Sequence, residues 1–496
     1  MKSGPQRYYT PALALLLLAC IVRFWLFLLP ESFWLDETVT AFVLRYGAGH
    51  PSLAAGPRLD QTVYYWLPRL SQAVFGYSEF SLRLPSLLAT IVSLFLIGRL
   101  AMRLIHAEAG WVAVFLCFIP HEFTRQATDA RPYGMGTCVA LCAMWFLVRW
   151  LDDGAWRDAA IFVILAALLL RVHLIYWPFY AVYASYAVIR RIRGETPVSG
   201  RVIAAVLSVV AVSLVPLVPV TLGLSGNAKV HVVTEMPTLK VILSGFQIPL
   251  IAAAGVGMWL VERLLRWPRE CLPIAFSGLA LLLGWWLWQP VCLLAASWLT
   301  GNSVFLARYF SLALPGMILT GTLAAGYSMP ARAWKPVAIA LAVGVLVVGS
   351  WKSPFPPSRN SHWREAAAAV NDLARDTDTP VICPSPFIEA QPPVWTPAYA
   401  LPGFLYAHLA AYPVRGATIL LPARRSPEGE QYGRTMMQKR ISPSGRFVVY
   451  GGVYGVNLWL AWLSQQPELS GWSERPVGSF GDVEVVLFER GTLRAR

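Results

Sequence analysis

The feature that most constrains this chain is a series of long apolar runs separated by short basic connections. The first run, from about residue 9 to residue 30, has the roughly 20 residues that an α-helix needs to cross a bilayer. The 496 residues are 56% hydrophobic and only 14% charged, and their mean hydropathy is +0.52. These proportions predict a polytopic α-helical membrane protein and exclude an ordinary soluble globular domain.

The apolar runs predict both the number of membrane spans and their direction. Eleven spans are expected, near residues 9–30, 84–104, 110–121, 134–151, 158–171, 174–190, 202–223, 241–261, 271–298, 310–327 and 336–351. Lys2 and Arg7 precede the first span, and every second connection after it is rich in Arg or Lys. Because cytoplasmic connections carry an excess of basic residues, we expect a multi-pass protein of the inner (plasma) membrane with a cytoplasmic N-terminus and an extracytoplasmic C-terminus.

The formal net charge of +14 is therefore interpreted as a topology signal. The basic residues are distributed over short connections instead of one polar domain, which argues against nucleic acid as a partner. Six of the seven cysteines lie in or beside apolar segments, with no CxxC motif and no zinc-ligand spacing. Neither a disulfide framework nor a cysteine metal site is indicated.

Two adjacent carboxylates, Asp36 and Glu37, follow the first span on the predicted outer side. Segments 36–46 and 61–70 of this external loop mix aromatic, aliphatic and charged residues, as expected of short helices in the interface plane. Asp36 should lie at or near a helix N-terminus, where the helix dipole favours the ionised carboxylate. The alternative is that both acids are solvated surface residues.

Further polar clusters fall on the same predicted side of the membrane, in segments 125–133, 171–173, 308–309 and 223–240, the last with Lys229, His231, Glu235 and Lys240. Ionisable groups near the membrane are costly, about 2.5–3.5 kcal/mol for Arg at a helix centre on insertion scales. An anion held at the outer surface would explain their recurrence. Taken singly, the arginines could instead reach phospholipid headgroups, and the tyrosines could be interfacial belt residues.

The composition changes after residue 351, where a proline-rich linker begins. Segment 362–373 reads as an amphipathic helix, and strand-like runs follow at 380–383, 417–421, 445–450 and 482–488. We therefore predict two domains, a transmembrane domain over residues 1–351 and a small extracytoplasmic α/β domain over residues 352–496. The second lacks nucleotide-binding motifs and is expected to serve acceptor access or stability.

The order and spacing of several motifs carry a family resemblance: Trp34-Leu35-Asp36-Glu37, Tyr64-Tyr65, segment 75–86, Asp129-Ala130-Arg131-Pro132-Tyr133, His173 and Arg308-Tyr309. Over roughly residues 10 to 350 this pattern resembles the GT-C membrane glycosyltransferases. The branch most similar contains the protein mannosyltransferases and the lipid A aminoarabinose and galacturonic acid transferases. The resemblance implies a GT-C fold of about 11 transmembrane helices, with interfacial helices in the first external loop.

The resemblance also implies a chemistry, namely inverting transfer of a sugar from a polyprenyl-phosphate (undecaprenyl phosphate) donor to a hydroxyl of an envelope lipid, glycan or protein. Asp36 matches the family's catalytic carboxylate, Asp129 matches its second acidic position, and Glu37 is the third catalytic candidate. The residues expected to bind the donor phosphate are Arg131, Tyr133, His173, Arg308, Tyr309 and Arg83, the last with a structural role as the alternative. Many relatives carry a His or Lys before the Tyr-Tyr segment, where this chain has Asp60-Gln61-Thr62-Val63. A cationic contact there is not expected, and the sequence leaves a divalent metal open.

Two other classes of function compete with this interpretation. A transporter or flippase for a lipid or lipid-linked sugar would also need many spans and buried charges, but it would favour paired repeats with broken helices. No internal duplication is evident in the sequence. A non-catalytic receptor or assembly factor would make the acidic pair dispensable. The identity of the sugar and of the acceptor does not follow from the residues.

Overall fold

The computed structural model describes residues 6–55, 62–219, 236–268, 272–301, 303–352, 355, 357–374 and 378–490. Lys2, Asp60, Gln61, Lys229, His231 and Glu235 lie outside these ranges. The chain divides into two compact units: the first comprises Met1–Leu29, Thr62–Gly76 and Arg83–Pro357, and the second comprises Pro30–Gln61, Tyr77–Leu82 and Ser358–Arg496. The domain boundary inferred from composition stays a prediction.

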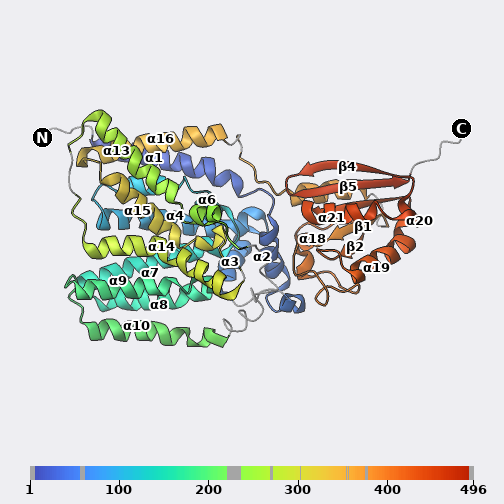
Figure 1. The fold of residues 1–496 in the computed structure, drawn as a ribbon, viewed down its shortest axis with the longest axis horizontal. Helices are drawn as coiled ribbons and strands as arrows, with labels where there is room; N and C mark the ends of the chain where they lie inside the picture. Colours follow the sequence, from blue (N-terminus) through green and yellow to red (C-terminus); the bar gives the residue numbers. More distant parts are fainter. Residues whose placement is uncertain are drawn as a thin grey trace. The chain divides into compact units, whose positions relative to one another are not determined.

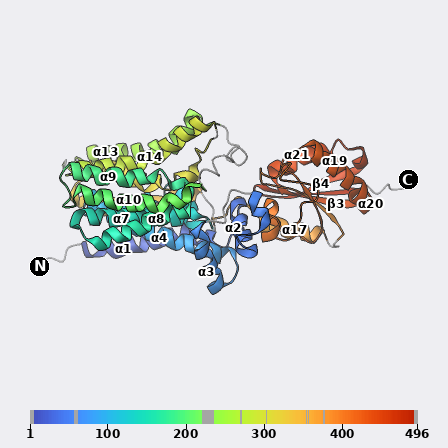
Figure 2. The same cartoon turned by 90° about the horizontal axis from the view of Figure 1, so that it is seen from below.

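The first unit is built from helices that run side by side in both views of Figures 1 and 2. Its helices are α1 (Gln6–Phe24), α3 (Trp66–Phe75), α4 (Glu79–Leu104, whose first turn belongs to the second unit), α5 (Gly110–Leu116), α6 (His121–Thr128), α7 (Pro132–Asp153), α8 (Trp156–Val172), α9 (Phe179–Ile192), α10 (Gly200–Leu214), α12 (Leu239–Gly245), α13 (Ile248–Leu265), α14 (Phe276–Thr300), α15 (Ala313–Gly326) and α16 (Trp334–Lys352). Each of the eleven spans expected from the sequence overlaps a helix; the one expected at 241–261 covers both α12 and α13, and the end of the one expected at 202–223 lies outside the described residues.

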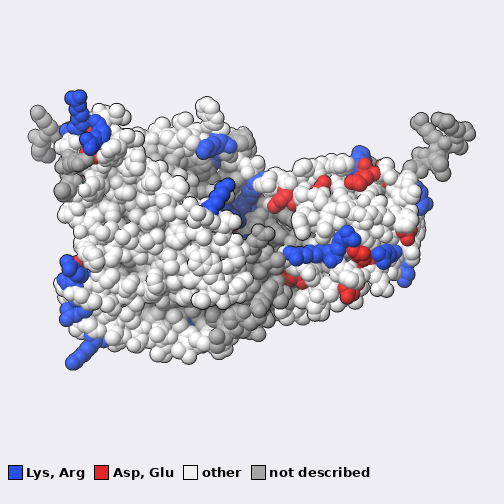
Figure 3. Space-filling view, in the orientation of Figure 1, with Lys and Arg blue, Asp and Glu red and all other residues white. Residues whose placement is uncertain are grey.

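Seven of the described helical segments are long and apolar enough to cross a membrane: Tyr9–Leu28, Glu79–Leu104, Pro132–Asp153, Gly200–Leu217, Ile248–Leu265, Phe276–Thr300 and Ala331–Lys352. The other four predicted spans correspond to α5, α8, α9 and α15, which have 7, 17, 14 and 14 residues. The polytopic α-helical class is confirmed, and the number of crossings stays a prediction. In Figure 3, Lys and Arg lie toward both ends of this unit, and a broad surface without charged residues separates them.

Small residues let these helices approach closely, as is typical of helix pairs in membranes. A Cβ atom on Gly316 of α15 would lie 2.5 Å from the backbone nitrogen of Trp286 in α14. A Cβ atom on Gly136 of α7 would lie 2.2 Å from the Tyr176 ring. Gly136 therefore makes room for an aromatic ring that lies beside the candidate site.

The second unit contains a five-stranded sheet with the order β2-β1-β3-β5-β4. Its strands are β1 (Pro380–Pro384), β2 (Ala417–Leu421), β3 (Arg446–Gly452), β4 (Trp472–Phe480) and β5 (Val483–Arg490). β1 pairs in parallel with β2 and β3, whereas β5 is antiparallel to both β3 and β4. Because four of these strands match the predicted strand-like runs, the expected α/β class is confirmed.

Helices cover both faces of this sheet. Helix α17 (Trp363–Leu373) lies on one face, and α19 (Pro427–Met436) and α21 (Val453–Leu463) lie on the other (Figure 2). The unit also includes α18 (Ala407–Ala411) and, from the segment after the first span, α2 (Leu35–Tyr46). The predicted amphipathic helix after the linker is thus confirmed as α17, and the predicted helix after the first span as α2.

Candidate functional site

The junction between α6 and α7 holds two charged side chains in the interior of the first unit. Helix α6 ends at Thr128 and α7 begins at Pro132, because proline suits a first helical position with its fixed φ and its missing N–H. The connecting backbone is tightly turned, since the Arg131 N–H donates to the Asp129 carbonyl at 2.8 Å. Asp129 and Arg131 are only 3% and 7% exposed.

A buried carboxylate needs a compensating charge, and Arg125 supplies one to Asp129. The Arg125 Nε and Asp129 Oδ2 atoms lie 3.7 Å apart, one turn of α6 from each other. Between them in sequence, the Gln126 side chain is buried and its Nε2 donates to the Ser311 carbonyl at 3.4 Å. The ion pair therefore lies beside the segment that carries Arg308 and Tyr309.

His173 lies at the end of α8, among three tyrosine rings. Its ring stacks on Tyr133 with centroids 5.7 Å apart, and lies 6.2 Å from the Tyr309 ring and 5.6 Å from the Tyr176 ring. The Ile175 N–H donates to Nδ1 at 3.2 Å, so a neutral ring carries its proton on Nε2. Burial, followed by the positive charges of Arg131 and Arg308, lowers the pKa of His173 to about 3. At neutral pH this side chain is a neutral hydrogen-bond donor.

Arg308 and Tyr309 lie on a single helical turn, Ala307–Phe310, immediately before α15. The Arg308 guanidinium carbon lies 5.4 Å from the centroid of the Tyr309 ring. The Tyr309 carbonyl accepts a bond from Gln289 Nε2 of α14 at 2.8 Å, which fixes this turn to a neighbouring helix. Both side chains are half-buried.

One narrow pocket joins several of these groups. Its lining consists of Glu122, Arg125, Gln126, Asp129, Tyr133, Ala307, Arg308 and Ser311. A second cavity of about 370 Å³ shares Glu122 and Ala307 with it. The rest of its lining is mainly apolar but includes the charged side chain of Lys240. The structure thus brings Asp129, Tyr133 and Arg308 into one pocket. The Tyr309 ring lies near His173, and the charge of Arg131 lowers the pKa of His173.

Sequence reasoning did not single out Gln126, Ser311 or Tyr176 as site residues. The Ser311 hydroxyl donates to the Tyr176 hydroxyl at 3.2 Å, and the Ser311 carbonyl accepts from Gln126. Ser311 lies two residues after Tyr309 and Gln126 falls inside segment 125–133, so proximity to those motifs was the available signal. The bonds themselves join residues 135 and 185 positions apart, which no local pattern reveals.

Arg83 has a different environment from the other arginines. Its side chain is 0% exposed, and Nη1 donates to the carbonyls of Leu28 and Leu29 at 3.1 and 2.9 Å. These carbonyls lie after the end of α1, at the end of the first span, where helical carbonyls lack intrahelical partners. The contacts support the structural alternative for Arg83 over a phosphate-binding role.

Asp36 and Glu37 belong to the second unit, in the first turn of α2. Asp36 is half-buried, whereas Glu37 is 0% exposed. The Glu37 carboxylate accepts the Trp34 N–H at 3.1 Å and forms an ion pair with Arg359 Nη1 at 3.4 Å. The expectation that Asp36 lies at a helix N-terminus is confirmed, and its neighbour has the contacts of a residue that fixes that helix end.

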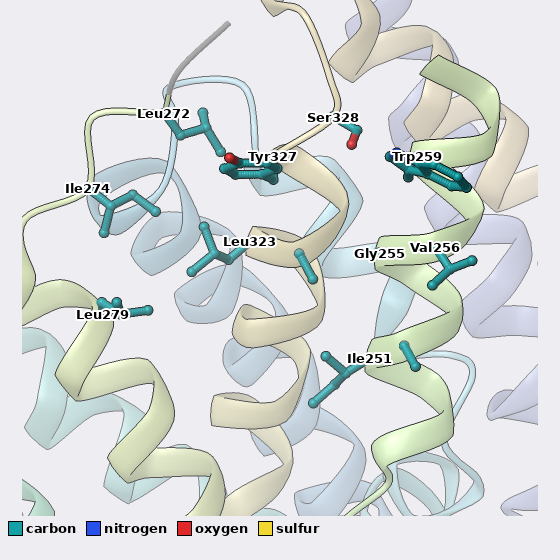
Figure 4. A pocket seen from close by; sticks show the side chains of 12 residues that line it. Ile251, Gly255, Val256, Trp259, Leu272, Ile274, Leu279, Leu323, Tyr327 and Ser328 are labelled. Carbon is teal, nitrogen blue, oxygen red and sulfur yellow. The ribbon is translucent and has the colours of Figure 1, made fainter. Parts of the chain in front are cut away.

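A larger cavity, of about 680 Å³, lies elsewhere in the first unit and has a different character. Figure 4 shows Ile251, Val256 and Trp259 of α13 on one side of it and Leu323 and Tyr327 from the end of α15 on the other. No carboxylate, Lys, Arg or His is among its lining residues in the described part of the chain. Likewise, no group of three or more His, Cys, Asp or Glu suited to a metal ion occurs among the described residues.

Comparison with known proteins gives a family match for part of the chain and a fold match for nearly all of it. Residues 60–221 match the family of dolichyl-phosphate-mannose-protein mannosyltransferases. No curated protein matches the sequence. Two crystal structures of ArnT from Cupriavidus metallidurans, the lipid A aminoarabinose transferase, are similar in fold. The apo state gives a TM-score of 0.57 and the complex with undecaprenyl phosphate 0.54, each at 12% identity over 96% of this chain and 98% of that chain. The predicted GT-C fold is confirmed.

Proposed function

We propose that this chain, which has the fold of the GT-C glycosyltransferases, is an inverting glycosyltransferase that uses a polyprenyl-phosphate-linked sugar. The observation that carries the proposal is the gathering of arginine, tyrosine and neutral histidine donors around one pocket of a membrane-spanning unit. The match of residues 60–221 to mannosyltransferases that use a lipid-phosphate donor supports the reaction class. The ArnT structure with bound undecaprenyl phosphate supports the choice of lipid carrier.

The proposed task of the pocket is to stabilise the departing lipid phosphate. Its negative charge grows as the bond to the sugar breaks, so fixed donors in a partly dehydrated site stabilise the transition state. Arg308 and Arg131 suit this task because a guanidinium can give two parallel hydrogen bonds to phosphate oxygens. Tyr133, Tyr309 and the Nε2–H of His173 would add neutral donors. Asp129, held by Arg125, would orient the donor or acceptor.

The proposed base is Asp36. Its carboxylate would accept the proton of the acceptor hydroxyl while that oxygen forms a bond to the anomeric carbon. The bond between the anomeric carbon and the phosphate oxygen breaks on the opposite side, which inverts the configuration and releases the lipid phosphate. Glu37, buried and paired with Arg359, is assigned to positioning in place of the catalytic role first expected.

The test compares D36N with D153N in the purified full-length chain. Asp153 is an exposed carboxylate at the far end of α7 and provides a matched control. Undecaprenyl-phosphate sugars are supplied with envelope lipid extract, and glycosylated products are measured by mass spectrometry. General base catalysis contributes about 10²–10⁴-fold, so D36N should lose that factor while D153N retains full turnover. A flippase would move the donor lipid in proteoliposomes without forming any new glycosidic bond. That result would contradict the proposed glycosyl transfer and favour a flippase.

The proposed location is the inner membrane, with the N-terminus in the cytoplasm and the second unit on the outer face, where the envelope lipid, glycan or protein acceptor is available. The Arg and Lys residues in alternate connections, such as Arg99 and Arg103, support this direction. Labelling of single cysteines by a membrane-impermeant maleimide tests it: a cysteine at exposed Arg424 should react in intact spheroplasts, and one at exposed Arg193 should react only after lysis.

A further inference from the structure

We infer that the C-terminal segment from Ser358 onward positions the proposed base, with Arg359 and Tyr412 as positioning residues that act through the backbone of the first external loop. The inference rests on the proposed function for the role of Asp36, but its structural content stands on contacts within the second unit. It gives the C-terminal domain a catalytic purpose beyond stability or acceptor access.

The helix that carries Asp36 is packed into the C-terminal domain. Helix α2 lies against α18, and Arg45 in the last turn of α2 donates from Nη1 to the Ala410 carbonyl at 2.8 Å. Further along the loop, the Phe404 N–H donates to Ser52 Oγ at 2.9 Å. These bonds join positions 365 and 352 residues apart in sequence, so the far end of α2 and the loop after it are held by the C-terminal segment.

The N-terminal end of α2 is held by a buried ion pair. Arg359 Nη1 lies 3.4 Å from Glu37 Oε2, and the two side chains are 12% and 0% exposed. The same oxygen accepts the Trp34 N–H at 3.1 Å. Burial of a carboxylate without a cation is strongly unfavourable. Arg359 therefore stabilises a charged Glu37 whose other contact fixes the first turn of the helix, and Asp36 lies in that turn.

The residues just before α2 are held by a second set of contacts. Tyr412 accepts the Phe33 N–H at 2.8 Å and donates its hydroxyl to Glu79 Oε1 at 2.9 Å. Arg364 also contacts Glu79, with Nη1 3.0 Å from Oε1, and its backbone N–H donates to Ser32 Oγ at 3.0 Å. Burial and then the charge of Glu79 raise the pKa of Tyr412, which keeps its hydroxyl protonated and able to donate.

Together these contacts fix the backbone on both sides of Asp36. A general base must lie within hydrogen-bond reach of the proton that it removes, and a displacement of about 1 Å can cost on the order of 10²-fold in rate. The donor phosphate, by contrast, is assigned to side chains of the first unit. Loss of Arg359 or Tyr412 should therefore lower kcat and leave the KM for the lipid donor nearly unchanged.

The experiment uses the full-length chain with variants R359M, R359K and Y412F, and with R415M as the control. Arg415 is exposed on the same unit, so R415M removes a charge without touching α2. We expect kcat to fall roughly 10–100-fold in R359M, with partial recovery in R359K and a smaller loss in Y412F. The KM for an undecaprenyl-phosphate sugar should stay within about twofold of the wild-type value. The double variant E37Q/R359M no longer buries an unpaired carboxylate. Its decrease in kcat should therefore not exceed that of R359M alone.

Hydrogen–deuterium exchange supplies a readout that does not depend on turnover. Amides of residues 33–38 should exchange faster in R359M and Y412F than in the wild type and R415M, while strands β1 and β3 stay protected. Unchanged exchange in this segment would overturn the inference even if the wild type forms no product. Normal kcat in R359M and Y412F, together with an inactive D36N, would overturn it while leaving the proposed function intact.

Discussion

The two units differ in how many arginines accompany a buried carboxylate at the sites described above. In the second unit, the buried carboxylate of Glu37 is matched by Arg359 at 3.4 Å, and the pair holds a backbone segment in place. In the first unit, Asp129 is also paired, with Arg125 at 3.7 Å, but Arg308 lines the same pocket together with Glu122, and the charge of Arg131 reaches the adjacent His173. The comparison separates a closed ion pair, which supports structure, from a cationic site suited to an incoming anion.

Among variants at the pocket of the first unit, the largest effect should come from replacing the guanidinium of Arg308. R308Q should lower kcat/KM for the lipid-linked donor by about 10²–10³-fold, because loss of a donor to the developing phosphate charge costs roughly 2.7–4 kcal/mol. Steady-state transfer rates measure this. R308K keeps the positive charge but lacks the planar guanidinium, so its kcat/KM should lie between those of the wild type and R308Q. R332Q, which removes an exposed arginine, is the control. Near-normal transfer by R308Q would show that the arginines of the first unit do not form a phosphate site.

Arg83 should behave as a structural cation although it belongs to the first unit. R83M leaves two buried carbonyls, those of Leu28 and Leu29, without this donor. We expect the free energy of unfolding to fall by about 2–3 kcal/mol. Thermal unfolding in detergent measures the loss. Transfer per folded molecule should change little, and a selective rise in the KM for the donor would instead assign Arg83 to the phosphate site.

His408 tests the electrostatics of the second unit by itself. The side chain is 0% exposed and lies among the rings of Trp363, Tyr406 and Tyr450. Burial lowers its pKa to about 3, so below pH 6.5 the unfolded chain binds a proton that the folded unit excludes. The free energy of unfolding should therefore decrease as the pH is lowered, by roughly 2 kcal/mol from pH 7 to pH 5.

The measurement for His408 is the unfolding midpoint as a function of pH, compared between the wild type and H408F. The variant should lose this share of the pH dependence, because phenylalanine has no proton to bind in the unfolded chain. Identical pH slopes for the two proteins would show that the histidine is protonated in the folded unit.

The smallest effect concerns His173. H173F removes the Nε2–H donor and should lower turnover about tenfold, whereas H173Q keeps an N–H donor and should be closer to the wild type. Because the pKa of His173 is lowered to about 3, the rate profile between pH 5 and pH 8 should be the same in the wild type and H173Q. A step near pH 6.5 present only in the wild type would show that the histidine is charged in that range.

Much of the fold could be predicted because hydropathy and period are local properties. All eleven predicted spans overlap helices, and four of the five strands were found from apolar runs. β4 was missed because it contains Pro476 and Gly478 and is largely exposed, which leaves no apolar pattern. Helix α5, with 7 residues, is shorter than the apolar run that predicted it, because composition reports apolar character but does not report where a backbone turns.

The candidate site was predictable in its residue types and less so in their roles. Segment 129–133 and the Arg308-Tyr309 pair were recognised as motifs, and the structure places Asp129, Tyr133 and Arg308 at one pocket. The closed ion pair of Glu37 could not be anticipated, because Arg359 is 322 residues away. The contacts of Arg83 with two carbonyls could not be anticipated either, because every residue has a backbone carbonyl and the sequence does not show which ones an arginine will contact.

The central claim is that the half-buried carboxylate of Asp36 removes the proton of the acceptor hydroxyl. Transfer of sugar from an undecaprenyl-phosphate donor by D36N, measured beside D153N at equal folded concentration, tests it most directly. We expect D36N to lose about 10²–10⁴-fold in turnover, with donor binding and unfolding midpoint unchanged. A D36N protein that transfers sugar at the wild-type rate would contradict it.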